Sequence, residues 1–283
     1  MLEYIKIFIM SLFSGALLPL PTSAAAHFSF LNVATKFSEE EKLLGFYYSL
    51  MTLVFSLVIF VLFRRIYISS FKSVFSKDGK KKKLQYRNLV IGTGVSLALS
   101  LVLCIPVSEG RLLMDYFDLF LKSNGVLLVA VSSVICGLIL LISSWYMSSS
   151  AGKYVAAPSV GSTIRFSVYQ LFSYVIPGLS HVSCASTNML TSDIKPEYLM
   201  VNVYTYIAPQ AFLISLIKII RAVAADNVVI NPMAVVIAVI VSGVACGFVV
   251  NFCVRANMRK LMLFFSIYSI FLGLLITVGS FII

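Results

Sequence analysis

The sequence predicts an all-α polytopic membrane protein, because of its composition and the length of its apolar segments. Of its 283 residues, 60 % are hydrophobic and 12 % are charged, whereas soluble domains carry about 25 % charged residues. Several nearly uncharged stretches reach about 20 residues, the length that crosses a bilayer core of about 30 Å. Backbone groups in hydrocarbon need internal hydrogen-bond partners, so these stretches should be helices.

Six segments have the composition of transmembrane helices. They are residues 42–63, 88–105, 125–147, 199–221, 232–254 and 261–283. Two further apolar stretches, 5–38 and 165–190, are interrupted by prolines and followed by polar residues. Proline removes a helix donor and clashes with the preceding turn, and polar groups at membrane depth must face protein or a water-filled cavity. We therefore expect two re-entrant helical hairpins in addition to the six spans.

The positive charges predict the orientation of the chain. Nine of the 22 basic residues lie between Arg64 and Arg87, and a basic loop between spans is typical of the cytoplasmic side. With residues 64–87 inside and 165–190 re-entrant, the basic loop at 255–260 also falls inside. If 165–190 were a full span, that loop would fall outside, so the charges favour re-entrance. Topology thus accounts for the net charge of +11 without a nucleic-acid partner, and contact with anionic lipid headgroups is a second role for the basic loop.

The predicted elements repeat. Residues 1–148 contain one hairpin and three spans, and residues 149–283 contain the same set in the same order. Because three is an odd number, the second half would enter the membrane from the opposite face. This is the pattern of an inverted repeat, in which broken helices meet near the bilayer midplane to form a binding site.

The two predicted hairpins share a proline followed, within seven residues, by small residues, a serine and a histidine. The candidate site residues in these turns are Pro21, Ser23 and His27 in the first, and Pro177, Gly178, Ser180, His181 and Ser183 in the second. A helix that begins after a break presents free amides and a positive dipole end, which suits a phosphate. Serine hydroxyls add hydrogen bonds, and histidine can transfer a proton or attack phosphorus. In the alternative interpretation, serine and histidine only cap broken helices.

Other polar residues in apolar surroundings have simpler interpretations. Arg165 is the nearest cation before the second turn, and it is either a phosphate ligand or a boundary residue that obeys the charge topology. We expect Gln170, Asn202, Gln210 and Asn251 to form interhelical hydrogen bonds. The five cysteines have neither metal-ligand nor disulfide spacing, so no metal site is predicted from the residues themselves.

At the two turns the chain resembles the undecaprenyl-diphosphate phosphatase family of the bacitracin-resistance type. Leu20-Pro21-Thr22-Ser23-Ala24-Ala25-Ala26-His27 is similar to the family's L-P-V-S-S-x-x-H element, and Pro177-Gly178-Leu179-Ser180-His181-Val182-Ser183 is similar to P-G-x-S-R-S-G. The resemblance implies six spans, two re-entrant hairpins and inverted repeats. It also implies a polyprenyl diphosphate substrate, and catalysis with acidic groups, a phosphate-binding arginine and a divalent cation (Mg²⁺ or Ca²⁺).

The sequence departs from the family pattern at the residues expected to carry the chemistry. The family's glutamates fall on Ser14 and Leu18, the arginine falls on His181, and the second serine falls on Ala24. We see no carboxylate ligands for Mg²⁺ or Ca²⁺, which prefer hard oxygen ligands. Loss of the arginine also removes bidentate binding of a phosphate.

Three functions therefore remain open. In the first, the protein hydrolyses a polyprenyl diphosphate with His27 as the catalytic residue, Ser23 and Ser180 as phosphate ligands, and His181 in place of the arginine. In the second, an inactive relative binds or translocates a lipid phosphate or another amphiphile. In the third, the chain is a structural subunit. The resemblance places the protein in the bacterial cytoplasmic membrane, in contact with the bilayer and a polyprenyl phosphate or diphosphate, and it leaves a homodimer open.

Overall fold

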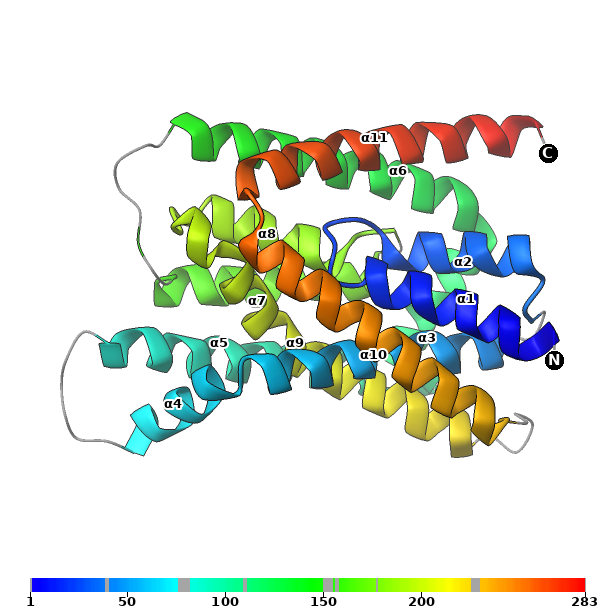
Figure 1. The fold of residues 1–283 in the computed structure, drawn as a ribbon, viewed down its shortest axis with the longest axis horizontal. Coiled ribbons are helices and arrows are strands. Elements are labelled where there is room, and N and C mark those ends of the chain that lie inside the picture. The colour runs from blue at the N-terminus through cyan, green and yellow to red at the C-terminus, as the bar shows by residue number, and fades with distance from the viewer. Residues whose placement is uncertain are drawn as a thin grey trace.

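The computed structural model describes residues 2–38, 41–75, 82–108, 111–149, 155, 158–176, 178–224 and 230–282. This part of the chain forms helices joined by short connections, with one two-stranded antiparallel ribbon (Figure 1). The elements are α1 (Leu2–Leu17), α2 (Ala24–Thr35), α3 (Glu41–Leu62), α4 (Arg64–Phe75), α5 (Lys82–Leu103), β1 (Pro106–Ser108), β2 (Arg111–Leu112), α6 (Leu113–Ser149), α7 (Val160–Val175), α8 (His181–Leu190), α9 (Pro196–Ala224), α10 (Pro232–Arg255) and α11 (Met258–Ile282).

An all-α polytopic membrane architecture is confirmed, with five described helices long and apolar enough to span a bilayer. Their apolar segments are Lys42–Leu62, Leu128–Tyr146, Pro196–Ala224, Pro232–Arg255 and Lys260–Val278. The sixth predicted span, residues 88–105, lies in α5, but its apolar segment Arg87–Leu103 is shorter than the other five. That span stays a prediction.

The basic segment at 64–87 is not wholly a loop. It contains α4 and the first turns of α5, because its apolar residues recur at helical rather than random spacing. Ile68, Phe71 and Phe75 lie on the exposed side of α4, beside exposed basic residues. A hydropathy window of about 20 residues averages such a short amphipathic helix to a polar value, so the sequence analysis missed it.

The segment at 106–124, also expected as a loop, contains β1, β2 and the first turns of α6. The Asp115 carboxylate accepts a hydrogen bond of 2.7 Å from the Leu112 amide, and a carboxylate in the first helical turn is favourable. Asp115 also forms a pair with Arg221 of α9, with two nitrogen–oxygen distances of 2.8 Å. This pair joins the start of α6 to the last turn of α9.

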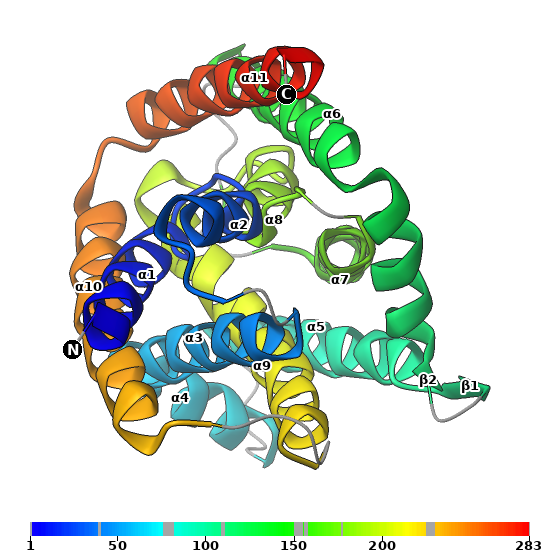
Figure 2. The same cartoon turned by 90° about the vertical axis from the view of Figure 1, so that its right-hand side faces the viewer.

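Two helical hairpins, α1–α2 and α7–α8, lie inside the frame of longer helices. Their turns point toward each other near the middle of the molecule (Figure 1), and the view along its length shows α2, α7 and α8 enclosed by the longer helices (Figure 2). Buried residues at the start of both second helices, Ala24 and Val182 among them, belong to one apolar core. The fold therefore places both turns that the sequence singled out against the same apolar core.

Each hairpin packs on a long helix of the other half of the chain. Helix α1 packs against α10, α7 packs against α5, α3 crosses α9, and α6 lies along α11. The α1–α10 contact is close: a Cβ atom on Gly15 would lie 2.5 Å from the carbonyl oxygen of Ser242. Only glycine permits this backbone approach.

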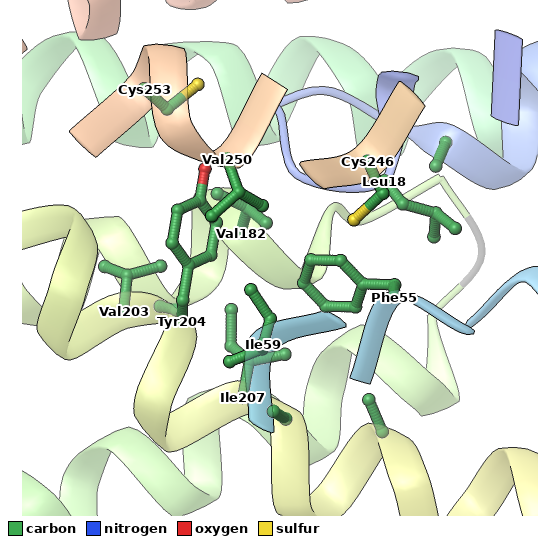
Figure 3. Close-up of a cluster of buried hydrophobic side chains, with 14 of the residues drawn as sticks. Leu18, Phe55, Ile59, Val182, Val203, Tyr204, Ile207, Cys246, Val250 and Cys253 are labelled. Atoms are coloured by element: carbon green, nitrogen blue, oxygen red, sulfur yellow. The ribbon is translucent and has the colours of Figure 1, made fainter. Parts of the chain in front are cut away.

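The core between the hairpins surrounds Tyr204 of α9, which is fully buried. Val182 and Val250 lie near its ring (Figure 3), and the ring of Phe55 meets it edge-on with centroids 6.3 Å apart. The Tyr204 hydroxyl donates a 2.8 Å hydrogen bond to the carbonyl oxygen of Pro19, an acceptor released by the break in the first hairpin. Tyr204 thus holds the first turn in place from the centre of the protein.

Candidate functional site

The first turn is built around Ser23, the N-cap of α2. Its Oγ accepts a hydrogen bond of 3.2 Å from the Ala26 amide, as expected for serine at this position. As an acceptor, the hydroxyl keeps its own hydrogen for another partner. Pro21 and Ser23 are both buried, so the turn is enclosed by protein.

His27 lies one turn into α2 and is held at both ring nitrogens. Nδ1 is 2.6 Å from the carbonyl oxygen of Ser23, and Nε2 is 2.6 Å from the hydroxyl of Tyr268 on α11. A carbonyl oxygen can only accept, so Nδ1 carries the proton. In the neutral ring, Nε2 therefore accepts from the tyrosine. The two rings are also stacked, with centroids 5.8 Å apart.

The second turn has the same cap. Ser180 is the N-cap of α8, and its Oγ accepts a 3.2 Å hydrogen bond from the Ser183 amide. Gly178 has φ = +82°, and a Cβ atom there would lie 2.8 Å from the carbonyl oxygen of Val129 on α6. Glycine is therefore required at this position by the backbone conformation and by close packing. Pro177 lies outside the described residues.

His181 is the first residue of α8 and is oriented by α7. Its Nδ1 is 2.5 Å from Oγ of Ser173, whose own hydrogen is donated to the carbonyl oxygen of Gln170 at 2.6 Å. Ser173 therefore accepts, and Nδ1 of His181 is the donor. The ring of Tyr174 lies on the imidazole, with centroids 4.2 Å apart. Nε2 of His181 has no hydrogen-bond partner among the residues that the structure describes.

The other two candidates of the second hairpin lie in different places. Ser183 is buried beside the turn, and its Oγ has no hydrogen-bond partner in the described part of the chain. Arg165 instead contacts the far end of α8, where it donates to Oδ1 of Asn188 at 2.7 Å and to Oγ of Ser192 at 2.9 Å. The guanidinium therefore ties α7 to the end of α8, away from the Ser180 cap.

Uncharged residues, Ser14 and Leu18, stand at the positions where the family has acidic residues. Ser14 is buried with no hydrogen-bond partner for its hydroxyl among the described residues, and Leu18 is part of the core around Tyr204. Among the described residues, no group of three or more His, Cys, Asp or Glu side chains could hold a metal ion. Hydroxyls and imidazoles do not replace the carboxylates that Mg²⁺ and Ca²⁺ prefer, so these residues do not fit a divalent cation.

The groups that orient the histidines could not be predicted from the sequence. Tyr268 is 241 residues from His27 in the chain, and no local pattern distinguishes it from the other aromatic residues of an apolar helix. Ser173 is closer, in the last turn of α7 and eight residues before His181, but serines are frequent throughout this sequence. These contacts depend on the packing of α11 and α7 and not on a motif.

The fold and the two capped turns define a class of protein: a polytopic α-helical membrane protein with two helical hairpins whose turns lie in its interior. The chain belongs to the family described as bacitracin resistance protein BacA, whose model matches residues 7–275. This match covers nearly the whole chain and confirms the resemblance found at the two turns. Among curated proteins, none matches the sequence.

Proposed function

We propose that this protein binds the phosphate group of a polyprenyl phosphate or diphosphate between its two hairpin turns. The proposal rests on a feature that the two turns share. In each, a serine caps the start of the following helix, and a nearby histidine donates a hydrogen bond from Nδ1 to a protein oxygen. Membership of the BacA family supports a lipid carrier as the ligand.

The donors at the turns suit an anion. The first amides of α2 and α8 lie at the positive ends of their helices, and helix starts are ready-made phosphate sites. The cap hydroxyls of Ser23 and Ser180 each retain a hydrogen to donate. Lys218 of α9 acts electrostatically on His181 and adds positive potential at the second turn. The bound phosphate would thus be held by dipoles, hydroxyls and one nearby cation.

The histidine tautomers predict a coupling between binding and protonation. In neutral His181 the free Nε2 carries a lone pair, which repels a phosphate oxygen. Nε2 becomes a donor when it takes up a proton, and the phosphate charge then stabilises the imidazolium. Binding should therefore take up a proton, so the affinity should fall as the pH rises.

The binding test uses protein in neutral nanodiscs titrated with undecaprenyl phosphate. We expect Ser180→Ala and His181→Gln to weaken binding, and His181→Gln also to remove the pH dependence. Ser56→Ala is the matched control, because Ser56 is a buried serine of α3 whose hydroxyl bonds only within its own helix. Unchanged affinity in both turn variants would refute the proposed site.

Hydrolysis is the second candidate function, and the orientation of His27 favours it. A histidine whose Nδ1 is bonded to a backbone oxygen presents Nε2 as a base or nucleophile. Against this, phosphoryl transfer depends on charge stabilisation, and Ser14 and Leu18 replace the family's acids. We therefore place binding, with transfer of the lipid phosphate across the bilayer, ahead of hydrolysis.

Phosphate release from undecaprenyl diphosphate separates these functions. Our proposal predicts background release by the purified protein, with or without Mg²⁺ or Ca²⁺, and no further loss in His27→Ala. Release above background that His27→Ala abolishes would instead establish the hydrolase.

We also propose that α1–α2 and α7–α8 are re-entrant hairpins of an inverted repeat of residues 1–148 and 149–283, with six spans and residues 64–87 at the cytoplasmic face. The hairpin of each half packs on a helix of the other half, α1 on α10 and α7 on α5, and this packing supports the arrangement. A single cysteine at Ser192, in a background without native cysteines, should react with an impermeant thiol reagent from the cytoplasmic side. Labelling only from the outside would make 165–190 a full span.

A further inference from the structure

A groove lies on the outer face of α10, outside the hairpin turns. It has a volume of about 310 Å³ and is lined by Phe248, Asn251, Phe252, Arg255 and Ala256. Phe248 is 77 % exposed and Phe252 is 56 % exposed. This face of α10 therefore combines two large aromatic side chains with an amide and a guanidinium.

Asn251 is the unexpected residue in this groove. We expected an interhelical hydrogen bond for this residue, but its side chain is exposed and has no hydrogen-bond partner in the described part of the chain. Leaving an amide without a partner in an apolar medium costs free energy. With a rise of 1.5 Å per residue, Asn251 lies about 6 Å along the helix from Arg255, which places it close to the depth of lipid phosphates. A lipid headgroup would supply the missing partner.

The turn from α10 to α11 adds positive charge to one end of the groove. Arg255 is the last residue of α10, and Lys260 lies in the first turn of α11; both are exposed. The Asn257 side chain caps only the Lys260 amide, at 3.2 Å, so the preceding amides at the start of α11 remain available to an anion. Residues 230–282 include no Asp or Glu.

We propose that this groove binds one anionic phospholipid, with its phosphate between Arg255 and Asn251 and an acyl chain along Phe248 and Phe252. The positive charge beside the groove favours an anionic headgroup. A zwitterionic lipid carries the same phosphate, but its ammonium group would find no carboxylate on α10 or α11 and would lie beside Arg255 and Lys260. An anionic lipid avoids this repulsion.

The test is native mass spectrometry of the protein in a neutral detergent, titrated with phosphatidylglycerol or with phosphatidylcholine of the same chains. We expect tighter binding of phosphatidylglycerol, weakened about fivefold by Arg255→Gln, since one basic residue near the surface contributes about this much to binding of anionic lipid. Asn251→Leu should also weaken binding, and inorganic phosphate at millimolar concentration should not compete.

Arg65→Gln is the matched control, because Arg65 of α4 is an exposed arginine outside the groove. It should leave the affinity unchanged, and so should Ser180→Ala, which separates this groove from the turns. Equal affinity for the two lipids would overturn the proposal, as would equal losses in Arg255→Gln and Arg65→Gln. Competition by inorganic phosphate would show that the groove recognises a free anion and not a lipid. Thermal midpoints of all variants establish that each protein is folded.

Discussion

Replacing Tyr268 with phenylalanine tests how His27 takes part in binding. In the structure the Tyr268 hydroxyl donates to Nε2 of His27 at 2.6 Å, and the two rings are stacked. A phosphate that contacts Nε2 must displace this hydroxyl. Tyr268→Phe removes the competing hydrogen bond and keeps the stacked ring, so binding no longer has to break that bond.

The magnitude follows from the cost of one hydrogen bond. A typical intramolecular hydrogen bond has a net worth of about 0.5–1.5 kcal/mol, and every 1.4 kcal/mol is about tenfold in affinity. Tyr268→Phe should therefore tighten the binding of undecaprenyl phosphate by about two- to tenfold in nanodiscs. Tyr169→Phe is the control, since Tyr169 is partly exposed on α7. Weaker binding in Tyr268→Phe would show that the hydroxyl itself contacts the phosphate, and unchanged binding would show that the ligand does not reach His27.

Two further predictions concern the frame. Gly15→Ala should lower the free energy of unfolding by up to about 2 kcal/mol, since overpacking against Ser242 costs about 1–3 kcal/mol and the higher helix propensity of alanine returns about 1 kcal/mol. Thermal unfolding in detergent measures this loss. Gly94→Ala is the control and should be neutral or stabilising, because a Cβ atom there would meet nothing within 4 Å. Burial raises the pKa of the Asp115 carboxyl, but hydrogen bonding and charge, mainly from Arg221, outweigh this and hold the pKa below its ordinary 3.8. Asp115 thus stabilises the protein above about pH 4, and this stability is lost as the pH falls through the lowered pKa. The thermal midpoint should fall over that acidic range in the wild type and less in Asp115→Asn; equal slopes would contradict this account.

The hydrophobic lengths of the sequence predicted the long helices well. The predicted spans 42–63, 199–221 and 232–254 agree with α3, α9 and α10 to within three residues at either end. Hydropathy is sufficient here because a helix in a bilayer must match the thickness of the hydrocarbon. It failed for α4, whose 12 residues are too few to register in a window of membrane length.

The sequence by itself determined the class of protein, the two broken segments and the serines that cap α2 and α8, because helix breaks and caps depend on neighbouring residues. Only the tertiary structure decided what the histidines contact. His27 meets Tyr268 and His181 meets Ser173, whereas Arg165 is directed to the end of α8 and Asn251 to the outer surface. A side chain's partner across helices depends on the rotation and crossing of those helices, which are set by contacts such as Gly15 on Ser242. No local pattern encodes those contacts.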